Sequence, residues 1–332
     1  MPSFRSVQVH TRSNDFRVAT EIVTVAQLPT ASAGHVVVQN HYVGINATDI
    51  NVTQGFYPGC TSLPFGCGLE ATGVITEVGE GVTSINVGDA VLYQKIGAFT
   101  EYVEVPAETL IKTEEVTPAL LSIAVCGISA SIALEYAGHL TTNETVLVTA
   151  AAGGTGQFAV QLAKLAGNHV IGTCSSSEKV AYLKSLGCDR VINYNEEDVS
   201  TVLAAEYPKG LDLVFEAVGG EMFKAAVDNI ATHGRIILFG NISSYKGQVS
   251  ELLFRAVYPK LLMKSASLHG FILYNHIEHV AGHIAKLVAL IKEGNLKAGV
   301  DPTEFKGLEG IPDAIDRMYA RKNIGKLVVR LV

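Results

Sequence analysis

The amino-acid sequence predicts an α/β fold in which a β-rich module is followed by a doubly wound parallel sheet. One observation is that short, glycine-punctuated segments of β character run from residue 36 to about 105. Another is that, from about residue 145, continuous apolar runs alternate with segments of helical period. Strands buried on both faces of a parallel sheet have such continuous runs, and right-handed crossovers then give a Rossmann-type unit.

The alternation is regular through the second half of the chain. Each apolar run has the length of a strand, and each segment between two runs has the length of a helix. Strands are expected at residues 146–148, 170–171, 191–192, 213–215, 236–239 and 268–273, and helices at residues 157–166, 179–186, 199–205, 222–230 and 276–293. The strand-like ending, residues 326–332, is expected to pack back onto the first module, which would make that module discontinuous in sequence.

Composition narrows the class of protein. The 332 residues fit about two domains, and 48% hydrophobic with 17% charged residues is ordinary for a globular chain. A net charge of −7 argues against a nucleic-acid partner. No apolar N-terminal run or span of about 18 apolar residues is evident, so no membrane partner is expected. Five scattered cysteines without a CxxC pair favour a reducing compartment, with the cytoplasm as the expected location.

A glycine-rich turn follows the first strand of the array. Ala151-x-Gly153-x-x-Gly156 matches the dinucleotide-binding pattern GxGxxG with alanine at the first position. Gly153 would let a pyrophosphate approach the backbone, the helix beginning near Thr155 would offer unpaired amides, and Gly156 would allow close helix–sheet contact. Its place at the first β–α step favours a dinucleotide site; a strand-to-helix turn without a ligand is the alternative.

The end of the second strand bears on the choice of cofactor. About twenty residues after Gly153, where an NAD-binding protein has Asp or Glu, the sequence has hydroxyl side chains around Ser175 followed by Glu178 and Lys179. Hydroxyls and an ammonium suit a dianionic 2′-phosphate, which a carboxylate would repel. NADPH is therefore expected, unless Glu178 points inward or the segment is only a serine-rich helix cap followed by a solvated lysine.

Residues 146–164 resemble the cofactor turn of the quinone oxidoreductases and prostaglandin reductases, which belong to the medium-chain dehydrogenase/reductase superfamily. The resemblance continues through residues 43–49, 68–73, 78–82, 216–220 and 322–326, and it is strongest to the prostaglandin reductase branch labelled zinc-binding alcohol dehydrogenase domain-containing. It implies a GroES-like catalytic domain at residues 1–125, completed by residues 296–332, and a Rossmann NADPH-binding domain at residues 126–295. A homodimer is the habit of this family.

The resemblance also implies roles for individual residues. Lys179 and Tyr194 would bind the 2′-phosphate region, with Ser175 nearby. At Ala217, where the branch often has a polar contact, only a backbone contact is implied. The other implied cofactor contacts are Gly153, Gly154, Thr155 and Gly156 at the pyrophosphate, Phe239, Asn241, Tyr245, Phe271, Ile272 and Leu273 beside the nicotinamide half, and Asn323 near the domain junction.

No metal is expected. Zinc alcohol dehydrogenases of this superfamily bind zinc through a Cys and a His at positions that here are Asn46 and Leu69. His276, His279 and His283 share one helical stripe, but an adjoining apolar stripe favours an amphipathic helix whose histidines form a solvent-facing flank. Metal binding by that stripe is the alternative. Cys67 and Cys126 are expected to be packing residues, with reactive thiols as the alternative.

A metal-free site suits hydride transfer to the β-carbon of an α,β-unsaturated ketone, with negative charge developing on an enolate oxygen. Asn46 and Tyr57 are the expected catalytic residues, because an amide or a phenol near that oxygen would stabilise the charge. A packing role for Tyr57 is nearly as well supported. The expected activity is NADPH-dependent reduction of enones of the keto-prostaglandin kind. A quinone oxidoreductase and an NADPH-binding protein without turnover stay open.

Overall fold

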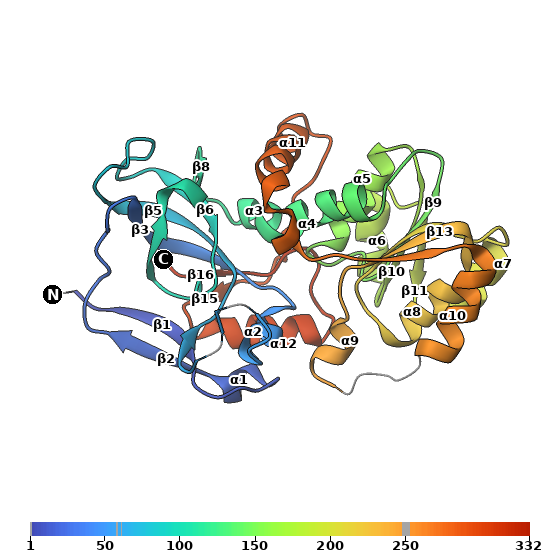
Figure 1. The fold of residues 1–332 in the computed structure, drawn as a ribbon, viewed down its shortest axis with the longest axis horizontal. Helices are drawn as coiled ribbons and strands as arrows, with labels where there is room; N and C mark the ends of the chain where they lie inside the picture. Colours follow the sequence, from blue (N-terminus) through green and yellow to red (C-terminus); the bar gives the residue numbers. More distant parts are fainter. Residues whose placement is uncertain (1, 58, 61, 248–252) are drawn as a thin grey trace. The chain divides into compact units, whose positions relative to one another are not determined.

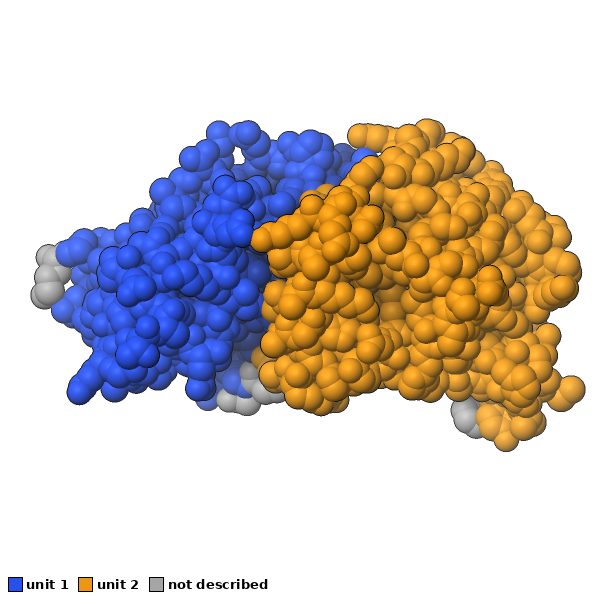
Figure 2. Space-filling model, turned by 90° about the horizontal axis from the view of Figure 1, so that it is seen from above, with its two compact units in different colours: residues 1–125, 300–332 blue, residues 126–299 orange. Residues whose placement is uncertain are grey.

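The computed structural model describes residues 2–57, 59–60, 62–247 and 253–332, which form two compact units. The first unit contains residues 1–125 and 300–332, and the second contains residues 126–299; Figure 2 colours them separately. The chain passes to the second unit after Val125 and returns after Gly299. The predicted return was at residue 296.

The second unit contains a parallel six-stranded sheet in the order β11-β10-β9-β12-β13-β14. The order reverses beside β9, which is the topology of a doubly wound sheet and confirms the predicted fold class. Its strands are β9 Thr145–Val148, β10 His169–Cys174, β11 Arg190–Asn193, β12 Leu211–Glu216, β13 Ile230–Leu238 and β14 Ser267–Gly270 (Figure 1).

Helices connect these strands and cover both faces of the sheet (Figure 1). Two of them begin at side-chain caps: Ser176 accepts from the amide of Lys179, and Asp198 accepts from that of Thr201. The helices are α5 Gly156–Leu165, α6 Ser177–Ser185, α7 Val199–Glu206, α8 Gly220–Asp228, α9 Ile242–Tyr245, α10 Leu253–Lys264 and α11 Val280–Lys292.

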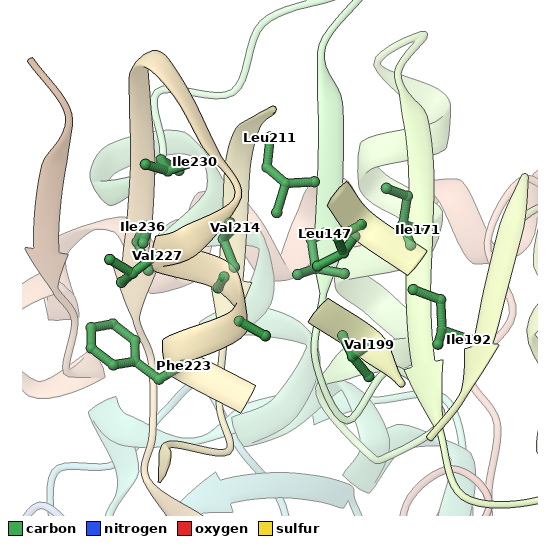
Figure 3. Close-up of a cluster of buried hydrophobic side chains, with 13 residues drawn as sticks. Leu147, Ile171, Ile192, Val199, Leu211, Val214, Phe223, Val227, Ile230 and Ile236 are labelled. Carbon is green, nitrogen blue, oxygen red and sulfur yellow. The ribbon is translucent and has the colours of Figure 1, made fainter. Parts of the chain in front are cut away.

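A buried apolar cluster on one side of the sheet holds this unit together (Figure 3). Leu147, Ile171 and Ile192 come from three neighbouring strands, and Phe223 on α8 packs in the same cluster. These positions lie on or next to the apolar runs of the sequence, which is why continuous hydrophobic runs predicted this sheet.

The first unit is mainly β-structure. A three-stranded sheet contains β2 Thr20–Val25, β1 Phe4–Val9 and β4 Phe65–Gly66. The C-terminal tail adds β16 (Val328–Arg330) to the larger sheet, where Val329 pairs with Val43 of β3 (His35–Gly44), so the tail packs on the first module as predicted. The larger sheet contains β15 Phe305–Lys306, β16 Val328–Arg330, β3 His35–Gly44, β5 Glu70–Val78, β6 Ala90–Gln94 and β8 Ile111–Thr113, with β7 Tyr102–Pro106 paired to β3. The helices α1 Phe16–Ala19, α2 Asp49–Thr53 and α12 Gly310–Tyr319 complete the unit.

One continuous helical stretch, residues 118–137, contains the point where the chain leaves the first unit. It consists of α3 Pro118–Leu121, the π-helical η2 Ser122–Gly127, α4 Ile128–Ile132 and the π-helical η3 Ala133–Ala137. With 20 residues and a mean hydropathy of 1.7 it is long and apolar enough to cross a membrane. However, 72% of its most apolar window is buried, and the core helix of a soluble protein meets the same criteria.

The structure corrects the prediction for residues 276–293. A 3-10 helix, η4 Leu273–His279, precedes α11, and the backbone of His276 is non-helical (φ −139°, ψ 27°). His283 is buried, and its Nδ1 lies 2.7 Å from the Ser131 hydroxyl on α4, while His279 stacks on Tyr136 at 4.0 Å. The predicted solvent-facing histidine flank is therefore wrong, because aromatic stacking and a buried hydrogen bond hold these rings against the unit.

Candidate cofactor site and catalytic residues

The glycine-rich turn packs so closely that one of its glycines has no substitute. A Cβ on Gly156 would lie 2.5 Å from the Ala150 carbonyl oxygen and 2.7 Å from the Cα of Ala151. A Cβ on Gly153 would meet only the Ala150 oxygen, at 3.2 Å. The requirement at Gly156 is thus contact between helix and strand, whereas Gly153 leaves the backbone open to approach from outside.

Alanine fits at the first position of the turn because the neighbouring strand provides the space. The amide of Ala151 donates to the Thr173 carbonyl on β10 at 3.1 Å, which ties the turn to that strand. A Cβ on Gly172 of β10 would lie 3.1 Å from the Ala151 Cβ and 2.9 Å from the Cys188 sulfur. A glycine on the second strand therefore accommodates the side chain that replaces the first glycine of the pattern.

A buried lysine follows the second strand. Lys179 is 8% exposed, whereas Glu178, its neighbour in the first turn of α6, is exposed. Tyr194 lies beside this strand end because its amide donates to the Cys174 carbonyl at 3.0 Å, and Asn195 Nδ2 donates to the Ser175 carbonyl at 2.7 Å. The structure thus brings Ser175, Lys179 and Tyr194 to neighbouring strand ends and leaves Glu178 on the surface.

A buried carboxylate organises the next strand end, and sequence reasoning missed it. Glu216 is 1% exposed, and it accepts from the amides of Val218 at 2.9 Å and Gly219 at 3.0 Å and from the Thr149 hydroxyl at 3.3 Å. Burial raises the pKa of Glu216, and the two amide donors oppose that shift. The one signal in the sequence is a glutamate that directly ends an apolar strand.

The backbone of Ala217, the residue directly after Glu216, is hydrogen-bonded on both sides. Its N–H donates to the Thr149 hydroxyl at 2.8 Å, and its carbonyl accepts from the Ile242 amide at 3.3 Å. The oxygen keeps a second lone pair, so the backbone contact predicted for Ala217 is open to a donor on the ligand.

The residues predicted for the nicotinamide half follow the ends of two neighbouring strands, three after β13 and three after β14. The Asn241 amide donates to the Tyr245 hydroxyl at 3.2 Å, and Asn241 Oδ1 accepts from the Ser244 hydroxyl at 3.1 Å. Phe239 packs against Phe271, with ring centroids 5.7 Å apart. Further along, Ile272 is 45% exposed, and Leu273 begins η4 half-buried.

In the first unit, Asn46 belongs to a buried charged network. Lys326 Nζ donates to Asn46 Oδ1 at 2.8 Å and to Glu70 Oε1, and Asn46 Nδ2 donates to the same Glu70 oxygen at 2.8 Å. Lys326 and Glu70 are at most 1% exposed. The Asn46 amide is thereby fixed in orientation, and the lysine polarises it from its oxygen side, which strengthens its N–H groups as donors.

Asp49 is a second buried acid that sequence reasoning missed. One carboxylate oxygen accepts from the Asn46 amide at 2.8 Å, whereas Oδ1 has no hydrogen-bond partner among the residues that the structure describes. Desolvation by burial raises the pKa of Asp49 to about 7. Burial therefore favours the protonated form of this carboxyl group far more than water does.

The two other residues predicted for this unit lie in loops. Tyr57 follows α2 and is half-buried, and its carbonyl accepts from the Cys60 amide at 3.1 Å. Asn323 precedes β16 and donates from Nδ2 to the Gly325 carbonyl at 3.2 Å. Asn46 and Tyr57 therefore flank α2, and Asn323, a predicted cofactor contact, belongs to the first unit.

The residues at the zinc-ligand positions of related dehydrogenases have other contacts. Asn46 is engaged by Glu70 and Lys326, and Leu69 has no atom that binds a metal. Within residues 2–57, 59–60, 62–247 and 253–332, no three His, Cys, Asp or Glu side chains are grouped to hold a metal ion. Cys67 and Cys126 are buried, as expected for packing residues, and desolvation raises the pKa of Cys67 well above its ordinary value.

Comparison with protein families defines the class of protein. Residues 32–115 match the alcohol dehydrogenase GroES-like domain, and residues 154–293 match the zinc-binding dehydrogenase model. The chain belongs to the medium-chain dehydrogenase/reductase family and is an oxidoreductase.

Individual relatives narrow the class further. The chain is 45% identical to prostaglandin reductase-3 of Bos taurus, covering all of this chain and 90% of that protein. It is 42% identical to a probable quinone oxidoreductase of Leishmania amazonensis, covering 99% and 98% of the two chains. Among solved structures, Escherichia coli quinone oxidoreductase complexed with NADPH is similar, with a TM-score of 0.85, 27% identity and coverage of 98% and 99%.

Proposed function

We propose that this protein is an NADPH-dependent reductase of the carbon–carbon double bond of α,β-unsaturated ketones. The observation that carries the proposal is the buried Lys179 at the end of β10, next to a turn that requires glycine at Gly156. The similarity to prostaglandin reductase-3 supports an enone of the keto-prostaglandin kind as the substrate.

The second unit fits NADPH at two places. The N-terminus of α5 begins at Gly156 and offers amides and a positive dipole end to a pyrophosphate. The Lys179 ammonium would pair with the 2′-phosphate, with the hydroxyls of Ser175 and Tyr194 as further donors. Glu178 is exposed, which supports this fit because a carboxylate pointing into that site would repel the phosphate.

Bound NADPH would supply a hydride to the β-carbon of the substrate. The chain's own part is to orient the enone and to stabilise the negative charge that develops on its carbonyl oxygen. We assign this to the Tyr57 hydroxyl and to the Asn46 N–H that donates to the Gly44 carbonyl at 3.4 Å, which would exchange this long hydrogen bond for one to the substrate oxygen. The same hydroxyl, or water, would return a proton to the α-carbon. No metal ion is needed in this scheme, and the Asn46 and Leu69 side chains support zinc independence.

A quinone is the alternative substrate, which the likeness to the Leishmania amazonensis protein supports. Consumption of NADPH by the purified protein, measured with a panel of enones and quinones, tests both substrate classes. Enones should be turned over faster than quinones, simple aldehydes or alcohols. If quinones are faster, the alternative holds. If NADPH binds and no compound is reduced, the protein binds the cofactor without turnover and the proposed function is wrong.

We also propose a cytoplasmic homodimer. The strand β14 lies at one edge of the six-stranded sheet, and the exposed side chains of Ile272, Tyr274 and Ile277 follow it in sequence. An edge strand offers backbone groups that a second copy could pair with. Light scattering should give twice the chain mass, whereas a monomer at micromolar concentration would contradict the assembly. Cell fractionation tests the location.

A further inference from the structure

The peptide unit between Ala124 and Val125 is held on both sides by side chains of the first unit. Gln94 Nε2 donates to the Ala124 carbonyl at 2.5 Å, and Glu70 Oε2 accepts from the Val125 amide at 2.9 Å. Glu70 and Gln94 are directly opposite each other on β5 and β6. One cross-strand pair thus binds the carbonyl and the N–H of the same peptide bond.

This peptide lies at a distinctive place in the chain. It belongs to the π-helical η2, and Val125 is the last residue before the chain passes to the second unit. In a regular α-helix the Val125 amide would donate to the carbonyl of Leu121, whereas here Glu70 accepts from it. The cross-strand pair therefore binds the backbone at the point where the chain leaves the first unit.

Lys326 links this exit to the point of return. Its side chain is paired with Glu70, and its carbonyl accepts from the Asp301 amide at 2.8 Å, next to an isolated parallel bridge between Val300 and Lys326. Val300 is the first residue after the chain returns to this unit. A single buried lysine is therefore connected to both chain crossings, through its side chain at one and through its backbone at the other.

Stability alone is a weak explanation for this arrangement. Burying Lys326 and Glu70 removes two charges from water, and a well-packed apolar pair of similar volume often stabilises a protein as well or better. A buried ion pair does give directional hydrogen bonds, which an apolar pair lacks. Directional contacts are useful where a backbone must keep one path.

We propose that Gln94, Glu70 and Lys326 form a crossing anchor, a set of positioning residues that fixes the two chain segments joining the units. This inference rests on the proposed function for its catalytic consequence: Glu70 and Lys326 also hold the side chain of Asn46, each at 2.8 Å. Hydride transfer requires reacting atoms to meet within a narrow range of distance and angle, so a loosened crossing lowers turnover more than it lowers cofactor affinity.

The test uses Gln94→Met in the full-length protein, because this change removes one hydrogen bond and leaves the buried ion pair intact. Gln39→Met is the matched control, since Gln39 is also half-buried and lies on β3 of the same sheet. Hydrogen–deuterium exchange of peptides covering residues 119–127 should become about three- to tenfold faster in Gln94→Met, as expected for one lost hydrogen bond. In the Gln39→Met control the exchange rate of the same peptides should stay at the wild-type value. With an enone, kcat should fall roughly tenfold while the NADPH dissociation constant stays within about twofold.

A second variant, Glu70→Met with Lys326→Met, removes both charges together, so that no unpaired charge stays buried. It should show faster exchange at the same peptides. Unchanged exchange in both variants, or faster exchange with unchanged kcat, would overturn the anchor. If the wild-type protein reduces no enone or quinone, the proposed function fails on that result, and the exchange rates still decide whether the crossing is anchored.

Discussion

Gly172 on β10 makes room for the side chain of Ala151 in the glycine-rich turn, because a Cβ at residue 172 would lie 3.1 Å from the Ala151 Cβ. The same added atom would lie 2.9 Å from the Cys188 sulfur. We therefore expect Gly172→Ala to lower the free energy of unfolding by about 1–3 kcal/mol through overpacking. Gly270→Ala is the control, since a Cβ at residue 270 of β14 meets no atom within 4 Å. Urea unfolding of both variants checks this, and equal stability would contradict it.

Gly156→Ala and Gly153→Ala should separate packing from cofactor access. A Cβ at residue 156 would lie 2.5 Å from a backbone oxygen, so this variant should lose several kcal/mol of stability or fail to fold. At residue 153 the nearest atom is 3.2 Å away, so the fold should survive while NADPH binds more weakly. Thermal unfolding and fluorescence titration with NADPH distinguish the two effects. Similar losses of stability in both variants would show that Gly153 is also required for packing.

The choice of cofactor depends on Lys179. Pairing a 2′-phosphate with a buried ammonium gives a charge-assisted hydrogen bond of roughly 1.5–3 kcal/mol, which is about a tenfold preference or more. Lys179→Ala should therefore raise KM for NADPH at least about tenfold and leave KM for NADH almost unchanged. Lys184→Ala, an exposed lysine in the last turn of the same helix, is the control. Equal use of NADH and NADPH by the wild-type protein would show that Lys179 has no part in the choice.

The buried Asp49 should make stability depend on pH. Its pKa is raised to about 7 in the folded protein, well above the ordinary value of an aspartate, so the folded state holds the proton more tightly. The stabilising contribution is complete below the unfolded pKa and is lost as the pH rises through about 7, at up to about 1.4 kcal/mol per pH unit. Urea unfolding at pH 5 and pH 8 should show this decline. Asp49→Asn should be much less sensitive to pH over that range, and an unchanged decline would assign it to other groups.

Metal removal should have no effect on activity. The side chains at the positions of the zinc ligands are Asn46, held by Glu70 and Lys326, and Leu69. The purified protein should contain far less than one zinc per chain, and chelator treatment should leave the rate of NADPH consumption unchanged. Elemental analysis and a chelation assay check this together. One tightly held zinc per chain, with activity lost on its removal, would refute the metal-free scheme.

Local patterns in the sequence predicted the parallel sheet well and the tertiary contacts poorly. The runs at residues 146–148 and 213–215 became neighbouring strands because buried parallel strands need continuous apolar residues. By contrast, Glu70 and Lys326 are 256 residues apart, and no local signal could pair them. The segment from His276 to His283 was predicted as one helix with a solvated flank. Its break and the burial of His283 arise from contacts with Tyr136 and Ser131, which helical periodicity does not encode.

The central claim is that NADPH reduces the carbon–carbon double bond of an enone, and the most direct test is to locate the transferred hydrogen. The protein would be incubated with an α,β-unsaturated ketone and NADPH that carries deuterium at the transferable position. Mass spectrometry and NMR of the product should show a saturated ketone with deuterium on its β-carbon. An allylic alcohol with deuterium on the former carbonyl carbon and the double bond intact would contradict the account.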